Sequence, residues 1–142
     1  MREEEPVRSV LDASALLVYL QGEPGSQGVQ AALAAGAVIN IVNYAEVLSR
    51  LNDAGEDPET ANRRLSEQGL IGGLLAVTPV TEEDAISIAR LRTATRAHGL
   101  SLGDRACLST GRRLGWPVVT ADRPARAYRR ACLRDVRRRP AS

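Results

Sequence analysis

The feature of this chain that most constrains its fold is the alternation of short apolar runs with segments of helical spacing. The runs are apolar over several consecutive residues, which is typical of strands that are buried on both faces. Strands of this kind that alternate with helices predict an α/β fold with a mainly parallel sheet. Four runs are expected as strands, over residues 8–13, 37–42, 74–80 and 116–122.

Helical patterns fill the intervals between these runs. A further segment, residues 132–137, alternates apolar and charged residues and is expected as a fifth strand at one edge of the sheet. Pro79 places the third strand at the opposite edge, because proline has no backbone N–H to donate to a neighbouring strand. The expected helices cover residues 14–20, 29–35, 44–54, 57–69, 81–99, 102–115 and 123–131.

The length of 142 residues, of which 44% are hydrophobic, fits one domain that buries a continuous core. We expect a single domain over residues 1–142, with its core at about 7–137 and a basic tail at 138–142. No apolar run approaches the roughly 20 residues that a membrane span needs. The acidic start "MREEEP" is unlike a signal peptide, so a cytoplasmic protein without membrane association is expected.

Missing residue types exclude several kinds of chemistry. All 19 basic residues are arginines, and a chain without lysine cannot form a P-loop or a Schiff base. The single histidine, His98, poorly supplies a zinc site or a Ser-His-Asp triad. Cys107 and Cys132 lack CxxC spacing and are expected as small structural thiols.

The net charge of +2 is spread unevenly along the chain. From Arg105 to the end there are eleven arginines, against only Asp122 and Asp135. Either a solvated surface or a face that binds polyanions explains this bias, and the sequence leaves both open.

Four carboxylates stand at one kind of position. Asp12 ends the first strand, Glu46 lies just inside the helix after the second, Asp104 opens the helix before the fourth, and Asp122 ends the fourth. Taken singly, each is also explained as a helix cap, and Ser101-x-x-Asp104 has the spacing of a capping box. Asn43-x-x-Glu46 has the same spacing.

Geometry favours a common site. The helix from Asp104 to Leu114 runs about 15 Å. The strand from Trp116 to Ala121 returns by about 16–17 Å, which brings Asp122 back to the level of Asp104. Strand carboxyl ends and helix N-termini share one edge of a parallel sheet, so all four carboxylates converge there.

Four close carboxylates repel one another unless a cation is present. Ligation by oxygen alone selects hard ions, here Mg²⁺ or Mn²⁺. Such a site is suited to hydrolysing phosphodiesters with a metal-activated water, and nearby arginines would neutralise a polynucleotide backbone.

The motifs resemble those of PIN-domain ribonucleases. "VLDASALL", "NYAEVLSRL", "LSLGDRACL" and "VVTAD" are similar to the four family motifs, in order, from Val10 to about Arg137. The size is similar to that of VapC-type toxins of bacterial toxin–antitoxin pairs. The resemblance implies a three-layer fold with a five-stranded parallel sheet in the order 3-2-1-4-5.

The resemblance also implies roles and partners. It implies that Asp12 and Asp104 are the principal metal ligands, that Glu46 ligates or positions the attacking water, and that Asp122 completes the site. Ser14 and Thr120 match hydroxyl positions that orient carboxylates or waters. An RNA substrate, a homodimer and a cognate antitoxin are implied as well. The antitoxin would lay a helix into a groove, for which residues 44–54, 57–68 and 69–75 are one candidate and a buried core the competing explanation.

The leading hypothesis is therefore a metal-dependent endoribonuclease that acts as a toxin. Arg105 and Arg123 are candidate phosphate contacts, with plain surface arginines as the alternative. An aspartate-based phosphatase is disfavoured, because Ser14 stands where a second aspartate is needed and lysine is absent. A non-catalytic PIN-like module that binds nucleic acid or protein is the remaining alternative.

Overall fold

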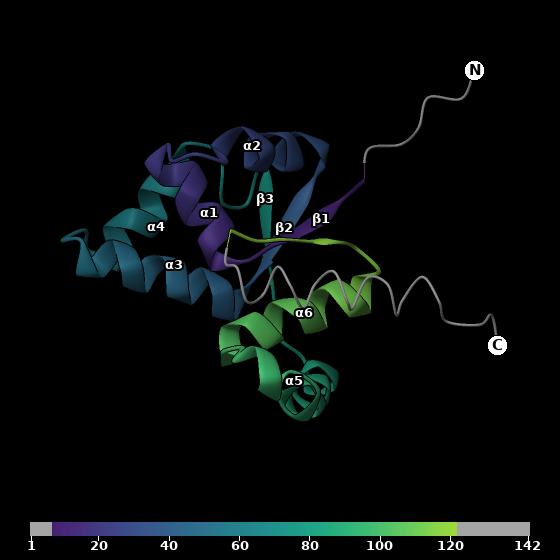
Figure 1. The fold of residues 1–142 in the computed structure, drawn as a ribbon. Coiled ribbons are helices and arrows are strands. Elements are labelled where there is room, and N and C mark those ends of the chain that lie inside the picture. Colours follow the sequence, from purple (N-terminus) through teal and green to yellow (C-terminus); the bar gives the residue numbers. More distant parts are fainter. Residues whose placement is uncertain (1–6, 122–142) are drawn as a thin grey trace, which may run out of the picture.

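A four-stranded parallel sheet lies between helical layers in the computed structural model, which describes residues 7–121 (Figure 1). The sheet order is β3-β2-β1-β4, and every pairing is parallel. This confirms the α/β class and the predicted order of the first four strands. The strands are β1 (Ser9–Leu11), β2 (Ala37–Asn40), β3 (Leu75–Thr78) and β4 (Val118–Val119). The predicted helix at 123–131 and fifth strand at 132–137 lie outside the described residues.

The helices follow the predicted pattern with changes at their ends. The helix predicted from residue 29 begins three residues earlier, at Ser26, after a left-handed Gly25. The helices are α1 (Ala13–Gln21), α2 (Ser26–Ala35), α3 (Ile41–Asp53), α4 (Pro58–Glu67), α5 (Glu82–Ala94), the 3₁₀ helix η1 (Arg96–His98) and α6 (Leu102–Leu114).

The junction of β2 and α3 corrects a prediction. Residues 41 and 42 were expected in the strand, because isoleucine and valine favour β structure. Instead, Asn40 ends the strand and caps the helix, since its Oδ1 accepts a hydrogen bond from the backbone N–H of Asn43 at 2.8 Å. The N-cap is therefore Asn40, and the capping box considered for Asn43 and Glu46 is wrong.

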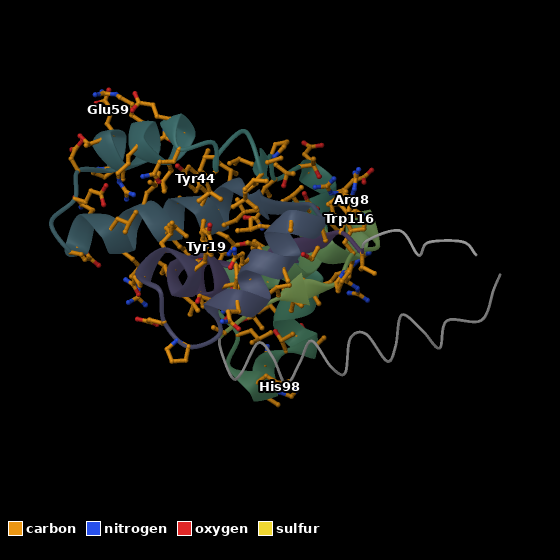
Figure 2. The ribbon with its side chains drawn as sticks, turned by 90° about the horizontal axis from the view of Figure 1, so that it is seen from above. Arg8, Tyr19, Tyr44, Glu59, His98 and Trp116 are labelled. Carbon is orange, nitrogen blue, oxygen red and sulfur yellow. The ribbon has the colours of Figure 1, made fainter. Side chains whose placement is uncertain are left out.

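The helix predicted over 81–99 is also interrupted. Regular α5 ends at Ala94, and the hydroxyl of Thr95 donates back to the carbonyl of Leu91 at 2.6 Å. A short 3₁₀ turn follows and ends at Gly99, whose φ of 61° favours glycine. His98 is exposed on this turn, at the periphery of the molecule (Figure 2).

The sheet separates two buried clusters, because side chains alternate between its faces. Leu11 and Ile39 belong to the cluster under α1–α4, whereas Val10 and Val38 belong to the cluster under α5 and α6. Cys107 is buried in the second cluster, so the structural role predicted for it is confirmed. No helix within residues 7–121 is long and apolar enough to cross a membrane.

Most of the apolar residues considered for an antitoxin groove lie in the core, although Leu74 is 56% exposed. The inner faces of α3 and α4 pack in the first cluster, together with the segment that follows α4. This favours the buried-core explanation for these side chains over a binding groove. The residues are Val47, Leu51, Ala61, Leu65, Leu70 and Leu75, all buried.

Candidate active site

An acidic pocket of about 640 Å³ opens where β1 and β2 end and where α1, α3 and α6 begin. Asp12, Glu46 and Asp104 line it from three separate elements, as the argument from sheet geometry predicted. The remaining lining residues are Ala13, Ser14, Leu17, Asn43, Arg50, Gly99 and Ser101.

Asp12 is the most buried of the three acids, since the residue is only 3% exposed. Its Oδ1 accepts hydrogen bonds from the hydroxyl of Ser14 at 2.7 Å and from the backbone N–H of Ala15 at 2.8 Å. Burial raises the pKa of Asp12 above its usual range; hydrogen bonds from Thr120, Ala15 and Ser14 oppose that shift, and the charge of Asp104 adds to it. Asp12 is therefore a helix cap and a pocket residue at once.

Glu46 lies in the second turn of α3, and its carboxylate rests against the α-carbon of Gly103 on α6. Partial burial is the largest cause that raises the pKa of Glu46, and the charges of Asp104 and Asp12 raise it further. Arg50 and the side chain of Asn43 oppose this shift without cancelling it. Three negative charges thus act on one another across the pocket.

Asp104 occupies the third position of α6 and forms a reciprocal capping box. Its Oδ2 accepts from the backbone N–H of Ser101 at 3.0 Å, while the Ser101 hydroxyl accepts from the N–H of Asp104 at 3.2 Å. The box holds the carboxylate at the pocket edge, because the side chain cannot rotate away without losing the bond. Asp104 therefore caps α6 and lines the pocket at the same time.

Ser14 joins Asp12 to the end of the fourth strand. Besides donating to Asp12, its hydroxyl lies 3.3 Å from that of Thr120 and accepts from the backbone N–H of Ala121 at 3.0 Å. The structure thus brings Ser14 and Thr120 beside the acids, where the sequence placed them. Asp122 and Arg123 lie outside the described residues.

The structure places Arg105 away from the pocket. Its Nη1 donates to the backbone carbonyl of Ile88 on α5 at 3.0 Å, and Arg105 is not among the lining residues. Sequence reasoning missed Asn43 and Arg50 as pocket residues. Their spacing was the available signal, since residues three before and four after Glu46 share its face of the helix.

The donor set suits a hard divalent cation, because the three acids offer only oxygen. Their mutual repulsion is also what a bound cation would relieve. Within residues 7–121, however, no three histidine, cysteine or acidic side chains are already grouped closely enough to hold an ion. A cation held by these acids would need further ligands, from water or from residues outside this range.

The fold and the pocket define a class of protein, namely three-layer α/β domains with an acidic site at the carboxyl edge of a parallel sheet. The chain belongs to the PIN domain family, whose model matches residues 9–131. The resemblance inferred from the four motifs is thereby confirmed. No curated protein sequence matches the chain closely enough to count as a relative.

Several solved structures have a similar fold. A sarcin–ricin-loop-cleaving VapC toxin of Mycobacterium tuberculosis is 13% identical with a TM-score of 0.66, and the match covers 84% of this chain and 94% of that one. The FitAcB structure from Neisseria gonorrhoeae gives 23% identity, a TM-score of 0.61 and coverages of 82% and 89%. A toxin–antitoxin complex from Klebsiella pneumoniae is 16% identical with a TM-score of 0.59, and the match covers 80% of this chain and 86% of that one. At these identities the likeness concerns the fold.

Proposed function

We propose that this protein is an Mg²⁺- or Mn²⁺-dependent endoribonuclease that acts as a VapC-type toxin and is neutralised by a cognate antitoxin. One observation carries the proposal: Asp12, Glu46 and Asp104 converge from three elements on one pocket. Burial raises the pKa of Asp12 and of Glu46, and the charge of Asp104 raises both further. A bound cation would offset this repulsion. Helix capping alone gives no reason for this convergence.

The residues have distinct roles in this proposal. Asp12 and Asp104 hold the cation, Glu46 ligates or orients the attacking water, and Asp122 completes the ligand set. When bound, the cation supplies Lewis-acid polarisation of the phosphodiester and activation of water. Ser14 and Thr120 fix the carboxylate of Asp12, whose Oδ1 accepts a hydrogen bond from the hydroxyl of Ser14.

The pocket also contains a cationic side chain for the substrate. Arg50 lines it one helical turn after Glu46 and is exposed, so it can meet a phosphate without breaking an ion pair recorded among the described residues. Arg123 is a second proposed phosphate contact. Arg105 is a third proposed phosphate contact, and it would have to give up its hydrogen bond to the Ile88 carbonyl to reach the pocket.

RNA as substrate and an antitoxin as partner are supported by the solved structures of similar fold. One of them is described as cleaving the sarcin–ricin loop and another as a toxin–antitoxin complex. The proposal includes a homodimer. A bound cation would supply an activated water as the nucleophile; with the 3′-oxygen as the leaving group, the expected products carry a 5′-phosphate and a 3′-hydroxyl.

The test is cleavage of total cellular RNA by the purified protein with Mg²⁺, with Mn²⁺ and with a chelator. Asp104→Asn is the test variant, since asparagine keeps an oxygen that can accept the Ser101 N–H and so preserves the cap. Glu59→Gln is the matched control, because Glu59 is exposed on α4 and does not line the pocket (Figure 2). Cleavage should require metal, survive Glu59→Gln and vanish in Asp104→Asn.

Two outcomes would count against the proposal. Cleavage to 2′,3′-cyclic phosphates would contradict attack by water, because the ribose hydroxyl would then be the nucleophile. Well-folded protein that neither cuts RNA nor binds Mg²⁺ in a titration would favour the non-catalytic binding module.

A further inference from the structure

Gly103 is a glycine that its backbone does not require. It is the second residue of α6 and does not have a positive φ, so any amino acid could adopt its conformation. Alanine would even be preferred within a helix, where glycine costs up to about 1 kcal/mol relative to alanine. The reason for glycine must therefore lie in what surrounds it.

The surroundings of Gly103 are occupied by Glu46. A β-carbon built on Gly103 would overlap Oε1 of Glu46, and both other carboxyl atoms lie within contact distance of it. Gly103 is itself buried, and no atom other than those of Glu46 is among its nearest contacts. The missing side chain thus forms a recess on α6 that the Glu46 carboxylate fills.

Asn43 ties the same two helices together next to this recess. Its Nδ2 donates to the backbone carbonyl of Gly103 at 3.0 Å, and the residue is only 1% exposed. Asn43 precedes Glu46 by three residues, so the two side chains share one face of α3. Asn43 is among the pocket residues, and its buried Oδ1 has no hydrogen-bond partner among the described residues.

We propose that Gly103 and Asn43 are positioning residues for Glu46: the recess receives the carboxylate, and the hydrogen bond from Asn43 holds the recess at the correct distance from α3. The functional consequence rests on the proposed metal-dependent nuclease. Glu46 is the only one of the three pocket acids that caps no helix, so no capping hydrogen bond fixes its carboxylate.

The decisive variant is Gly103→Ala. The Glu46 carboxylate is the far end of a flexible side chain, so the added methyl group displaces it without unfolding α6. Gly28→Ala is the matched control, because Gly28 lies in the first turn of α2 and its β-carbon would meet no atom within 4 Å. Both substitutions add the same methyl group to a helical glycine, and only one meets Glu46.

The first measurement is a thermal-unfolding cycle in metal-free buffer with Gly103→Ala, Glu46→Ala and the double variant. In the Glu46→Ala background, Gly103→Ala should raise Tm by about 2–4 °C, as a helical glycine-to-alanine change does. With Glu46 present the gain should be smaller or absent. An equal change of Tm in both backgrounds would overturn the proposed contact, whatever the protein does to RNA.

The second measurement is Mn²⁺ affinity, followed by titration calorimetry with the metal alone. Gly103→Ala should weaken Mn²⁺ binding about as much as Glu46→Ala does, by roughly tenfold or more as for outer-shell positioning groups. The double variant should be no weaker than either single variant, and Gly28→Ala should equal the wild type. Wild-type affinity in Gly103→Ala, or losses that multiply in the double variant, would contradict the positioning role.

These two readouts fail for different reasons. If wild-type protein binds no Mn²⁺, the proposed nuclease fails, whereas the unfolding cycle still decides whether Gly103 accommodates Glu46.

Asn43→Ala tests the proposed role of the hydrogen bond from Asn43, with Thr110→Val as its control. Thr110 on α6 accepts a hydrogen bond from Nδ2 of Asn40, the N-cap of α3, away from Glu46. Asn43→Ala should weaken Mn²⁺ binding and Thr110→Val should not; equal affinity in the two variants would remove Asn43 from the proposal.

Discussion

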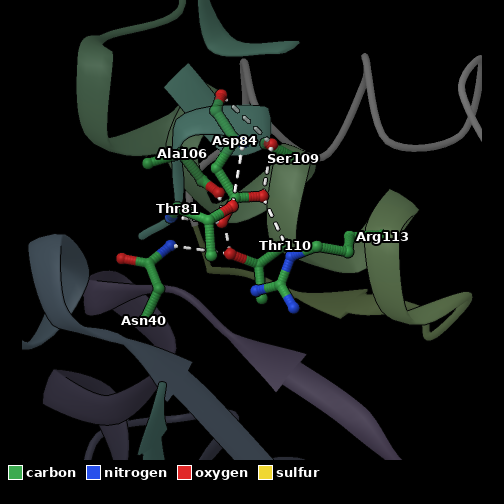
Figure 3. Close-up of polar contacts among 7 residues, drawn as sticks. All are labelled: Asn40, Thr81, Asp84, Ala106, Ser109, Thr110 and Arg113. Carbon is green, nitrogen blue, oxygen red and sulfur yellow. Dashed lines mark hydrogen bonds and ion pairs between the residues drawn. The ribbon is translucent and has the colours of Figure 1, made fainter. Parts of the chain in front are cut away.

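Arg113 and Asp84 form an ion pair that joins the last turn of α6 to the first turn of α5, with Nε of Arg113 donating to Oδ1 of Asp84 at 3.1 Å (Figure 3). Asp84 is 1% exposed and also accepts from Ser109 at 3.1 Å and from the N–H of Thr81 at 3.0 Å. The pair lies at the opposite end of α6 from Asp104. It fixes α5 against the helix that presents the acidic pocket.

Asp84→Ala should destabilise the protein more than Arg113→Ala does. Removing Asp84 leaves Ser109 and the Thr81 N–H without their acceptor in a buried place, which costs about 2–4 kcal/mol. The Arg113 side chain is 31% exposed and can return to water, so its loss should cost about 1 kcal/mol. Urea unfolding of both variants measures the difference. Equal costs would show that Asp84 matters only as the partner of Arg113.

The same carboxylate makes stability depend on pH. Burial by itself would raise the pKa of Asp84, but bonds from Thr81, Arg113 and Ser109 together hold that pKa below its ordinary value of 3.8. A lowered pKa in the folded state means that Asp84 stabilises the fold fully above about pH 3.8 and that this contribution is lost as pH falls through the folded pKa. Between pH 6 and pH 3, the stability gap between wild type and Asp84→Asn should therefore shrink. A gap that widens towards acid pH would reverse the assigned sign.

Ser14→Ala should impair the pocket with only a modest loss of stability. The hydroxyl donates to Asp12 and accepts from the N–H of Ala121, so its removal takes one hydrogen bond from Asp12 and leaves that N–H without this acceptor. We expect RNA cleavage to fall about 10–100-fold and the free energy of unfolding to fall by about 1 kcal/mol. Ser49→Ala is the control, since its exposed hydroxyl donates to the carbonyl of Ala45 on the same helix, α3. If both variants cleave RNA equally well, Ser14 has no role in orienting Asp12.

The sequence predicted the sheet and the acidic edge because both depend on local patterns. The buried strands are short apolar runs, and their order follows from the family resemblance. Asp12 and Asp104 were recognisable because each follows or opens a predicted element. Their caps are local as well, with bonding partners two or three residues away.

What the sequence did not predict depends on contacts between distant residues. The recess at Gly103 exists only because α3 and α6 pack closely, and nothing near Gly103 in the chain indicates Glu46. Arg105 was a candidate phosphate contact because it follows Asp104, but successive helical residues point about 100° apart, and its Nη1 donates to the Ile88 carbonyl on α5. The start of α3 was missed because Ile41 and Val42 favour strands, while the cap of Asn40 outweighs that preference.

Metal ions should reverse the stability order of wild type and Glu46→Gln. The raised pKa of Glu46 means that the folded state holds its proton more tightly than the unfolded state does, so at neutral pH the ionised side chain disfavours folding. Without metal, Glu46→Gln should be as stable as wild type or slightly more so, by about 0.5 kcal/mol or less because the residue is exposed.

With Mn²⁺ at 100 times its Kd, wild type should gain about 2.7 kcal/mol and the variant clearly less, since one charged ligand is gone. Calorimetric Tm values with Mn²⁺ and with chelator measure both halves. Equal gains in the two proteins would show that Glu46 lies outside the metal's ligand set, and no gain in either would mean that the repulsion in the pocket is not relieved by a metal ion.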